Sequence, residues 1–359
     1  MTRDDVAALS RRRIDEAARG PGRAPSRDGD GLVQPTMVPQ YLEGRAPERQ
    51  REGRTAERPA YYAYPPLKKP HWKFHVPLYF YLGGIAAGTQ LVASLAALFG
   101  GRREAPVVRA GRYLSAPLVA IAQLLLIADL GRPERAHHMF RIVKTRSPMS
   151  MGSWGLALFS GVSGLLFVLQ GFGDVLRARW AAAIAMPLAV LAIPASLFTG
   201  GYTGVLLSAT AVPLWAKGRG ALPPLFLSSA LATGGAAIGA MLALVGRAPR
   251  SPALATAIAA GLAGELAAEA ALEATLGESR RHLTAPPEAI RHRAAVAFGV
   301  VAPLVLLAPA IGGRAPFASR LLLASALALA GGLVTRFSII EAGKHSADDA
   351  SSYWDWTHR

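Results

Sequence analysis

The feature that most constrains the fold is a series of long apolar stretches that begins after about residue 70. The first, residues 76–99, contains no charged residue. Its length of about 24 positions exceeds the roughly 20 that a helix needs to cross a bilayer. Similar stretches follow at 113–130, 150–172, 181–208, 223–245, 252–276, 294–311 and 321–340. The pattern predicts an all-α polytopic membrane protein with eight transmembrane helices.

The fourth stretch contains residues that disfavour a straight helix. Pro187, Pro194 and the pair Gly200–Gly201 lie within it. Proline removes a backbone hydrogen bond, and inside a membrane the freed groups need protein or a cavity to satisfy them. We therefore expect this span to be kinked or interrupted.

Composition separates three regions. Residues 1–70 are rich in Arg, Gly, Pro and acidic residues and predict a disordered basic tail. Residues 71–345 form the predicted eight-helix membrane domain, and 346–359 a polar C-terminal tail. The net charge of +16 would suit nucleic acid. However, the basic residues lie in the tail and in loops, so we expect them to meet lipid headgroups and expect no nucleic-acid partner.

The distribution of basic residues also predicts orientation. With eight spans, both termini lie on one side, and about three quarters of the 39 Lys and Arg residues lie there too. By the positive-inside rule we expect a multi-pass protein of the inner (plasma) membrane with cytoplasmic termini.

Two residue types limit the redox chemistry of the protein itself. The sequence contains no cysteine, which excludes thiolate-ligated iron–sulfur clusters in this protein. Of its eight histidines, only His75 lies at the opening of a predicted span. A haem between two intramembrane histidines is therefore not expected, and no metal site is predicted.

The head of the first span carries polar aromatic side chains. His75 and Tyr79 are four residues apart, so they share one helix face near the membrane interface. An imidazole and a phenol there can hydrogen-bond the two carbonyl oxygens of a quinone and exchange protons with them. The alternative is an ordinary interfacial aromatic belt.

The loop after the second span is dense in charge. Asp129 and Arg132 could pair and cap the helix end. Alternatively, the basic residues of this loop could dock an acidic redox subunit; the candidates are Arg132, Arg135 and Arg141.

Carboxylates also occur inside the sixth span. Glu265, Glu269 and Glu273 repeat every four residues, and Glu265 lies near the middle of the run. A carboxylate at that depth faces protein or water and indicates either a proton path or a structural ion pair. Arg336 in the eighth span is one possible partner.

Four blocks of sequence resemble the NrfD/polysulfide reductase membrane-subunit family. They are WKFHVPLYFYLGGIAAG from Trp72, ADLGRPERAHHMFRIVKTRSPMSMGSW from Ala128, YTGVLLSATAVPLW from Tyr202 and TRFSIIEAGKHSADD from Thr335. Together they span most of the membrane portion and are specific as a set.

The resemblance implies an eight-helix respiratory subunit, in two four-helix bundles, without a redox centre of its own. It implies that menaquinone or ubiquinone binds near the start of the first span and the end of the fourth, at His75, Tyr79 and Tyr202. It also implies electron exchange with a ferredoxin-like 4Fe–4S subunit joined to a molybdopterin enzyme of the polysulfide reductase or formate dehydrogenase type. We assign proton transfer to Asp129 and Glu265.

Three alternatives remain open at the level of sequence. Many members of the family present the quinone side to the periplasm, whereas the charge distribution here favours the cytoplasm. The protein could instead translocate protons or ions by means of the glutamate face. It could also be a passive anchor without quinone chemistry.

Overall fold

A computed structural model describes residues 67–249, 251–286, 288–349 and 352–353. Within these residues, eight helical segments are long and apolar enough to cross a membrane, which confirms the all-α polytopic prediction. The predicted tail 1–70 lies outside the described residues except for 67–70. The spans are α3 (His75–Phe99), α4 (Ala105–Ala128), α5 (Pro148–Val175), α6 (Arg179–Ser208), α8 (Leu222–Leu244), α9 (Ala253–Leu276), the composite of α11 (Glu288–Ala294), η5 (Ala295–Val301) and α12 (Ala302–Ile311), and α13 (Ala318–Asp348).

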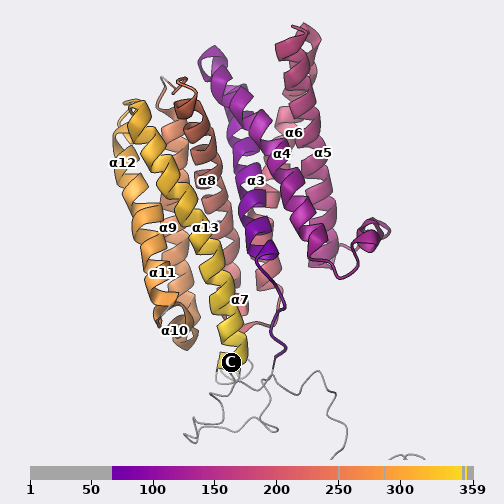
Figure 1. Cartoon of the computed structure of the whole chain (residues 1–359), viewed down its shortest axis with the longest axis vertical. Coiled ribbons are helices and arrows are strands. Elements are labelled where there is room, and N and C mark those ends of the chain that lie inside the picture. The colour runs from indigo at the N-terminus through magenta and orange to yellow at the C-terminus, as the bar shows by residue number, and fades with distance from the viewer. Residues whose placement is uncertain (1–66, 250, 287, 350–351, 354–359) are drawn as a thin grey trace, which may run out of the picture. The chain divides into compact units, whose positions relative to one another are not determined.

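The spans form two groups of four, as expected. The first bundle contains α3–α6, and the second contains α8, α9, α11–α12 and α13. Figure 1 shows α3 between them, with α4 on one side and α8 on the other. Because successive spans are antiparallel, α3, α5 and α8 all begin at one end of the bundles, here called the His75 end. The opposite end, where α3 finishes, is called the Phe99 end.

The two bundles are joined by a glycine contact between α3 and α8. A Cβ on Gly88 would lie 1.8 Å from the carbonyl oxygen of Ala230, and one on Gly234 would lie 2.3 Å from the carbonyl carbon of Gly88. Neither position can hold a side chain unless the helices separate. Small residues drive close helix packing in this way within membranes, where apolar surface alone gives no preference for protein over lipid.

Several spans differ from their predicted bounds at charged or proline-rich ends. α4 begins at Ala105 and not at 113, because Arg109 and Arg112 find partners on α5. α6 is helical through Pro187 and Pro194, so the fourth span is not interrupted, and of the two expectations a kink is the one that stays a prediction. The seventh span contains instead a π-helical segment directly before Pro303, whose missing N–H cannot support regular α-helical bonding.

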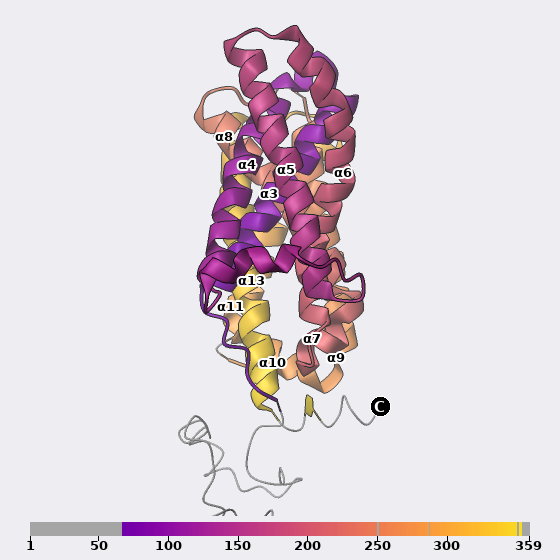
Figure 2. The same ribbon diagram turned by 90° about the vertical axis from the view of Figure 1, so that its right-hand side faces the viewer.

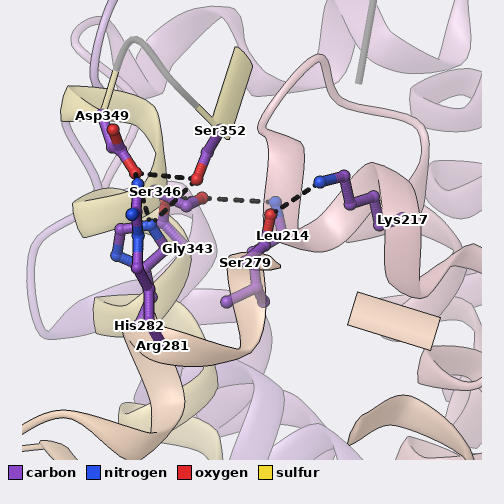
Figure 3. Close-up of polar contacts among 9 residues, drawn as sticks. All are labelled: Leu214, Lys217, Ser279, Arg281, His282, Gly343, Ser346, Asp349 and Ser352. Carbon is purple, nitrogen blue, oxygen red and sulfur yellow. Dashed lines mark hydrogen bonds and ion pairs between the residues drawn. The ribbon is translucent and has the colours of Figure 1, made fainter. Parts of the chain in front are cut away.

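Short elements close the second bundle at the His75 end, namely α7 (Pro213–Lys217) and α10 (Arg281–Thr284) (Figure 2). Figure 3 shows Arg281 and His282 directed at Asp349, and the His282 Nε2 lies 3.0 Å from the Asp349 carboxylate. The Leu214 N–H donates to Ser346 Oγ at 3.3 Å. α13 ends at Asp348, so residues 346–348 of the predicted C-terminal tail are part of this helix.

Candidate functional site

His75 and Asp129 lie together at the His75 end of the first bundle. The His75 Nδ1 is 3.7 Å from Asp129 Oδ1, and their side chains are 25% and 22% exposed. This separation is within the range of an ion pair but too long for a hydrogen bond. The predicted pair between Asp129 and Arg132 is not formed; the carboxylate that ends α4 faces the imidazole that begins α3.

Tyr79 and Tyr202 line one small cavity, one turn deeper than His75. Its walls come from α3, α5 and α6 and include Gly152, Leu156 and Thr199. The cavity has about 10 Å³ of space for a water-sized sphere, close to the room that one water needs. Tyr79 is buried in the core, whereas Tyr202 sits in the cavity wall. Two predicted site residues that are distant in sequence thus meet.

Two glycines of α5 make room for the aromatic rings of α6. A Cβ on Gly152 would lie 2.1 Å from Tyr202 Cζ, and one on Gly155 would lie 2.0 Å from Phe198 Cε1. The rings of Phe198 and Tyr202 stack at 5.3 Å, and the Tyr202 hydroxyl donates to the carbonyl of Pro148. The start of α5 therefore sets the position of Tyr202, a role that the sequence did not reveal.

A second, larger cavity adjoins the other side of the Tyr202 ring. It measures about 570 Å³, and its walls come from the starts of α5 and α8 and the end of α6. Most of the lining is apolar, including Met151, Leu197 and Leu227, with Thr145 and Arg146 also present. Tyr202 lines both cavities, so its ring forms the partition between the outer groove and the inner pocket.

Several buried polar atoms around the inner pocket have unused hydrogen-bonding capacity. Thr199 Oγ1 in the pocket wall and His75 Nδ1, which lies outside the lining and beside Asp129, have no hydrogen-bond partner. The Tyr79 hydroxyl, which lines the pocket, donates to none of the described residues. An unpartnered polar atom in a membrane interior is costly, so a polar ligand would be favoured here. The groups can donate to carbonyl oxygens, and the groove can hold an apolar tail.

The three predicted docking arginines lie apart from this pocket. Arg132, Arg135 and Arg141 are exposed in and beside η2 (Pro133–Phe140), the loop that joins α4 to α5. The same loop begins at Asp129 and ends at Pro148, both of which contact site residues. The exposed arginines therefore lie on a loop whose two ends contact residues of the site.

A second set of buried polar residues lies inside the second bundle. Glu265 and Arg336 are each 2% exposed. The Arg336 Nη1 donates to Ser229 Oγ, and the same hydroxyl contacts Glu265. The predicted partnership is thus present, but it runs through Ser229 and not through a direct ion pair.

Further ionisable side chains lead from Glu265 towards the His75 end. Glu269 follows one turn later and lies 3.4 Å from His292 Nε2, which is 3.7 Å from Glu273. Glu273 in turn pairs with the exposed Arg280 at 2.5 Å. His292 was missed at the level of sequence because it follows a polar loop, whereas α11 carries it into the bundle with 3% exposure.

The described part of the protein offers no metal centre. No group of three or more His, Asp or Glu side chains there is arranged to hold a metal ion.

Comparison with known proteins agrees with this architecture. The family described as Polysulphide reductase, NrfD matches residues 67–346. The protein is 30% identical over 179 residues to a polysulfide reductase component of Wolinella succinogenes, an alignment that covers 45% of this sequence and 55% of that protein. It is 28% identical over 90 residues to a protein described as a candidate membrane subunit of dimethyl sulfoxide reductase in Halobacterium salinarum, covering 25% of this sequence and 20% of that protein.

Both alignments span only part of each relative, about half of the first and a fifth of the second. The family match, in contrast, extends over all eight spans. The chain therefore belongs to the NrfD family of multi-pass membrane proteins.

Proposed function

We propose that this protein is the quinone-binding membrane subunit of a respiratory oxidoreductase complex. The observation that carries the proposal is the partition formed by Tyr202 between a lipid-side apolar groove and an inner pocket with unused hydrogen-bonding groups. A quinone has a polar ring with two carbonyl oxygens and a long apolar tail. The groove of about 570 Å³ takes the ring and the tail, and one carbonyl oxygen reaches the inner pocket, which has room for about one water. The substrate is menaquinone or ubiquinone.

Tyr79 and Tyr202 of the pocket, with His75 and Asp129 one turn closer to the His75 end, bind the ring and handle protons. Tyr79 and Tyr202 donate to one carbonyl oxygen after the Tyr202 hydroxyl turns away from Pro148. His75 serves the other oxygen, and Asp129, at 3.7 Å, supplies protons to the imidazole or accepts them. Reduction of the ring takes up two electrons and two protons, and oxidation releases the same.

The electrons pass to or from a partner, because the sequence has no cysteine to bind a cluster. The exposed arginines Arg132, Arg135 and Arg141 form the docking surface for a ferredoxin-like 4Fe–4S subunit, which joins a molybdopterin catalytic subunit. Docking there places the partner next to the pocket, on the other side of the Asp129–Pro148 loop.

The row of buried ionisable side chains in the second bundle, Glu265, Glu269 and His292, favours a second function, proton transfer. We propose that Glu265 holds a proton that reaches it from the His75 end through Glu273, His292 and Glu269. Each step joins side chains within one helical turn or within 4 Å. Such a row is costly in a membrane and is typical of proton relays.

The purified complex tests the proposal with two readouts. We expect His75→Ala combined with Tyr202→Phe to lower quinone-linked turnover at least about tenfold, because both substitutions remove groups that contact the ring. We expect Arg132→Glu, Arg135→Glu and Arg141→Glu together to lower the amount of iron–sulfur subunit that copurifies. Arg320→Glu, an exposed substitution at the Phe99 end, is the control.

Unchanged turnover in an intact His75→Ala/Tyr202→Phe complex would contradict the quinone site. Full retention of the iron–sulfur subunit by the arginine variant would contradict the docking surface alone.

A further inference from the structure

A large cavity lies at the Phe99 end, remote from the site described above. It measures about 710 Å³ and opens between α4, α6 and α8. This volume is within the range of ligand-binding sites. Its polar lining consists of Arg109, Arg112, Tyr113, Gln170 and Arg247.

The cavity carries an excess of positive charge. Three arginines line it, and Asp174 pairs with only one of them, Arg109, at 2.5 Å. The remaining hydrogen bonds to Asp174 come from the Tyr113 hydroxyl at 2.8 Å and the Gln170 amide at 3.1 Å. Arg112 and Arg247 therefore have no carboxylate partner among the described residues.

Arg112 supplies a buried, positively charged group to the cavity wall. Arg112 is only 7% exposed. Its Nη1 donates to Gln170 Oε1 at 3.0 Å, and its Nε has no hydrogen-bond partner. A buried guanidinium without an anion is unfavourable at membrane depth. The cost falls if an anionic group enters the cavity and accepts from the free N–H.

The surroundings indicate where that anion comes from. The apolar lining includes Met186, Met241 and Val245, and Val245 is 57% exposed beside Leu244 at 72%. Side chains so apolar and so exposed face lipid. Arg247 is exposed directly after α8 ends, at the depth where headgroups lie.

We propose that this cavity binds an anionic phospholipid. The headgroup phosphate accepts hydrogen bonds from Arg112 and Arg247, and an acyl chain lies along Met186, Met241 and Val245. Arg109 stays paired with Asp174 and orients Gln170, which holds Arg112 towards the phosphate. The lipid would join the two bundles at the end opposite the quinone pocket.

Native mass spectrometry of the complex, extracted from nanodiscs of phosphatidylcholine with phosphatidylglycerol or cardiolipin, tests this proposal. We expect retention of the anionic lipid to fall about tenfold in Arg112→Gln and about fivefold in Arg247→Gln. Arg247 lies in an exposed loop, so Arg247→Gln should leave the helix packing intact. Arg320→Gln, an exposed arginine at the same end, is the matched control and should retain lipid normally.

Two further measurements distinguish a bound anionic lipid from free phosphate and from a zwitterionic lipid. Inorganic phosphate added to the detergent-solubilised complex should not displace the lipid, because it lacks the acyl chain. The proposal is overturned if phosphate alone displaces it. It is also overturned if phosphatidylcholine is retained equally, or if Arg112→Gln and Arg247→Gln both retain anionic lipid as the parent complex does.

Discussion

The polar side chains buried at the His75 end of the first bundle differ in kind from those buried inside the second. At the His75 end of the first bundle, Tyr79, Tyr202 and Thr199 are uncharged and lie next to a groove with apolar walls. In the second bundle, Arg336, Glu265, Glu269 and His292 are ionisable, are at most 3% exposed and lie inside the packed helices.

This difference determines which ligand each of the two regions can accept. A neutral quinone ring can enter from lipid along an apolar path and meet uncharged hydrogen-bonding groups at its end. Charged groups must instead be shielded from lipid and linked to each other or to water, an arrangement suited to protons. Because the two sets lie in different bundles, quinone chemistry and proton storage can be separated by substitution.

The strongest test of this separation is Glu265→Gln. We expect proton movement by the complex in liposomes to fall about a hundredfold, because the amide cannot carry a proton through the row. Quinone-linked turnover measured with an uncoupler should stay within about twofold, since the first bundle is unchanged. A pH-sensitive dye and a quinone assay on the same liposomes provide both measurements.

Glu341→Gln is the matched control, because this carboxylate is partly exposed at the His75 end and pairs only with Lys344 among the described residues. Equal proton movement in the parent and Glu265→Gln complexes would remove the second bundle from the mechanism. An equal loss of turnover would show that the two bundles do not act separately.

A smaller effect is expected from Gly152→Ala in the first bundle. The added Cβ would lie 2.1 Å from Tyr202 Cζ, so the ring must move. We expect quinone-linked turnover to fall about tenfold through misplacement of the ring. Gly161→Ala on the same helix meets nothing within 4 Å and should leave turnover unchanged. Equal turnover in the two variants would mean that the position of Tyr202 does not matter.

The sequence predicted the spans well but not their charged ends. The uncharged interior of each span gives a clear signal of length. Arg109 and Arg112 in α4 and the residues of α11 obscure it, because their partners come from other helices. Likewise, nothing local indicates that α6 continues through Pro187 and Pro194, since neighbouring helices decide the effect of a membrane proline.

Contacts between distant segments limited the prediction of the site in the same way. The resemblance indicated Tyr202, and Glu265 was recognisable as a mid-span carboxylate. In contrast, the approach of Asp129 to His75, the place of Gly152 under Tyr202 and the entry of His292 into the row depend on how helices pack. A pattern of helix spacing within one span carries no information about these contacts.

Photolabelling with a ubiquinone analogue that carries an azide on its ring identifies the segments that contact the quinone. In the illuminated complex, mapped by peptide mass spectrometry, we predict labels on the first turns of α3 around Tyr79 and the last turns of α6 around Tyr202. Unlabelled menaquinone or ubiquinone should suppress them. Labels confined to α9 and α13 of the second bundle, or labels that excess quinone does not suppress, would rule out a quinone site beside Tyr79 and Tyr202.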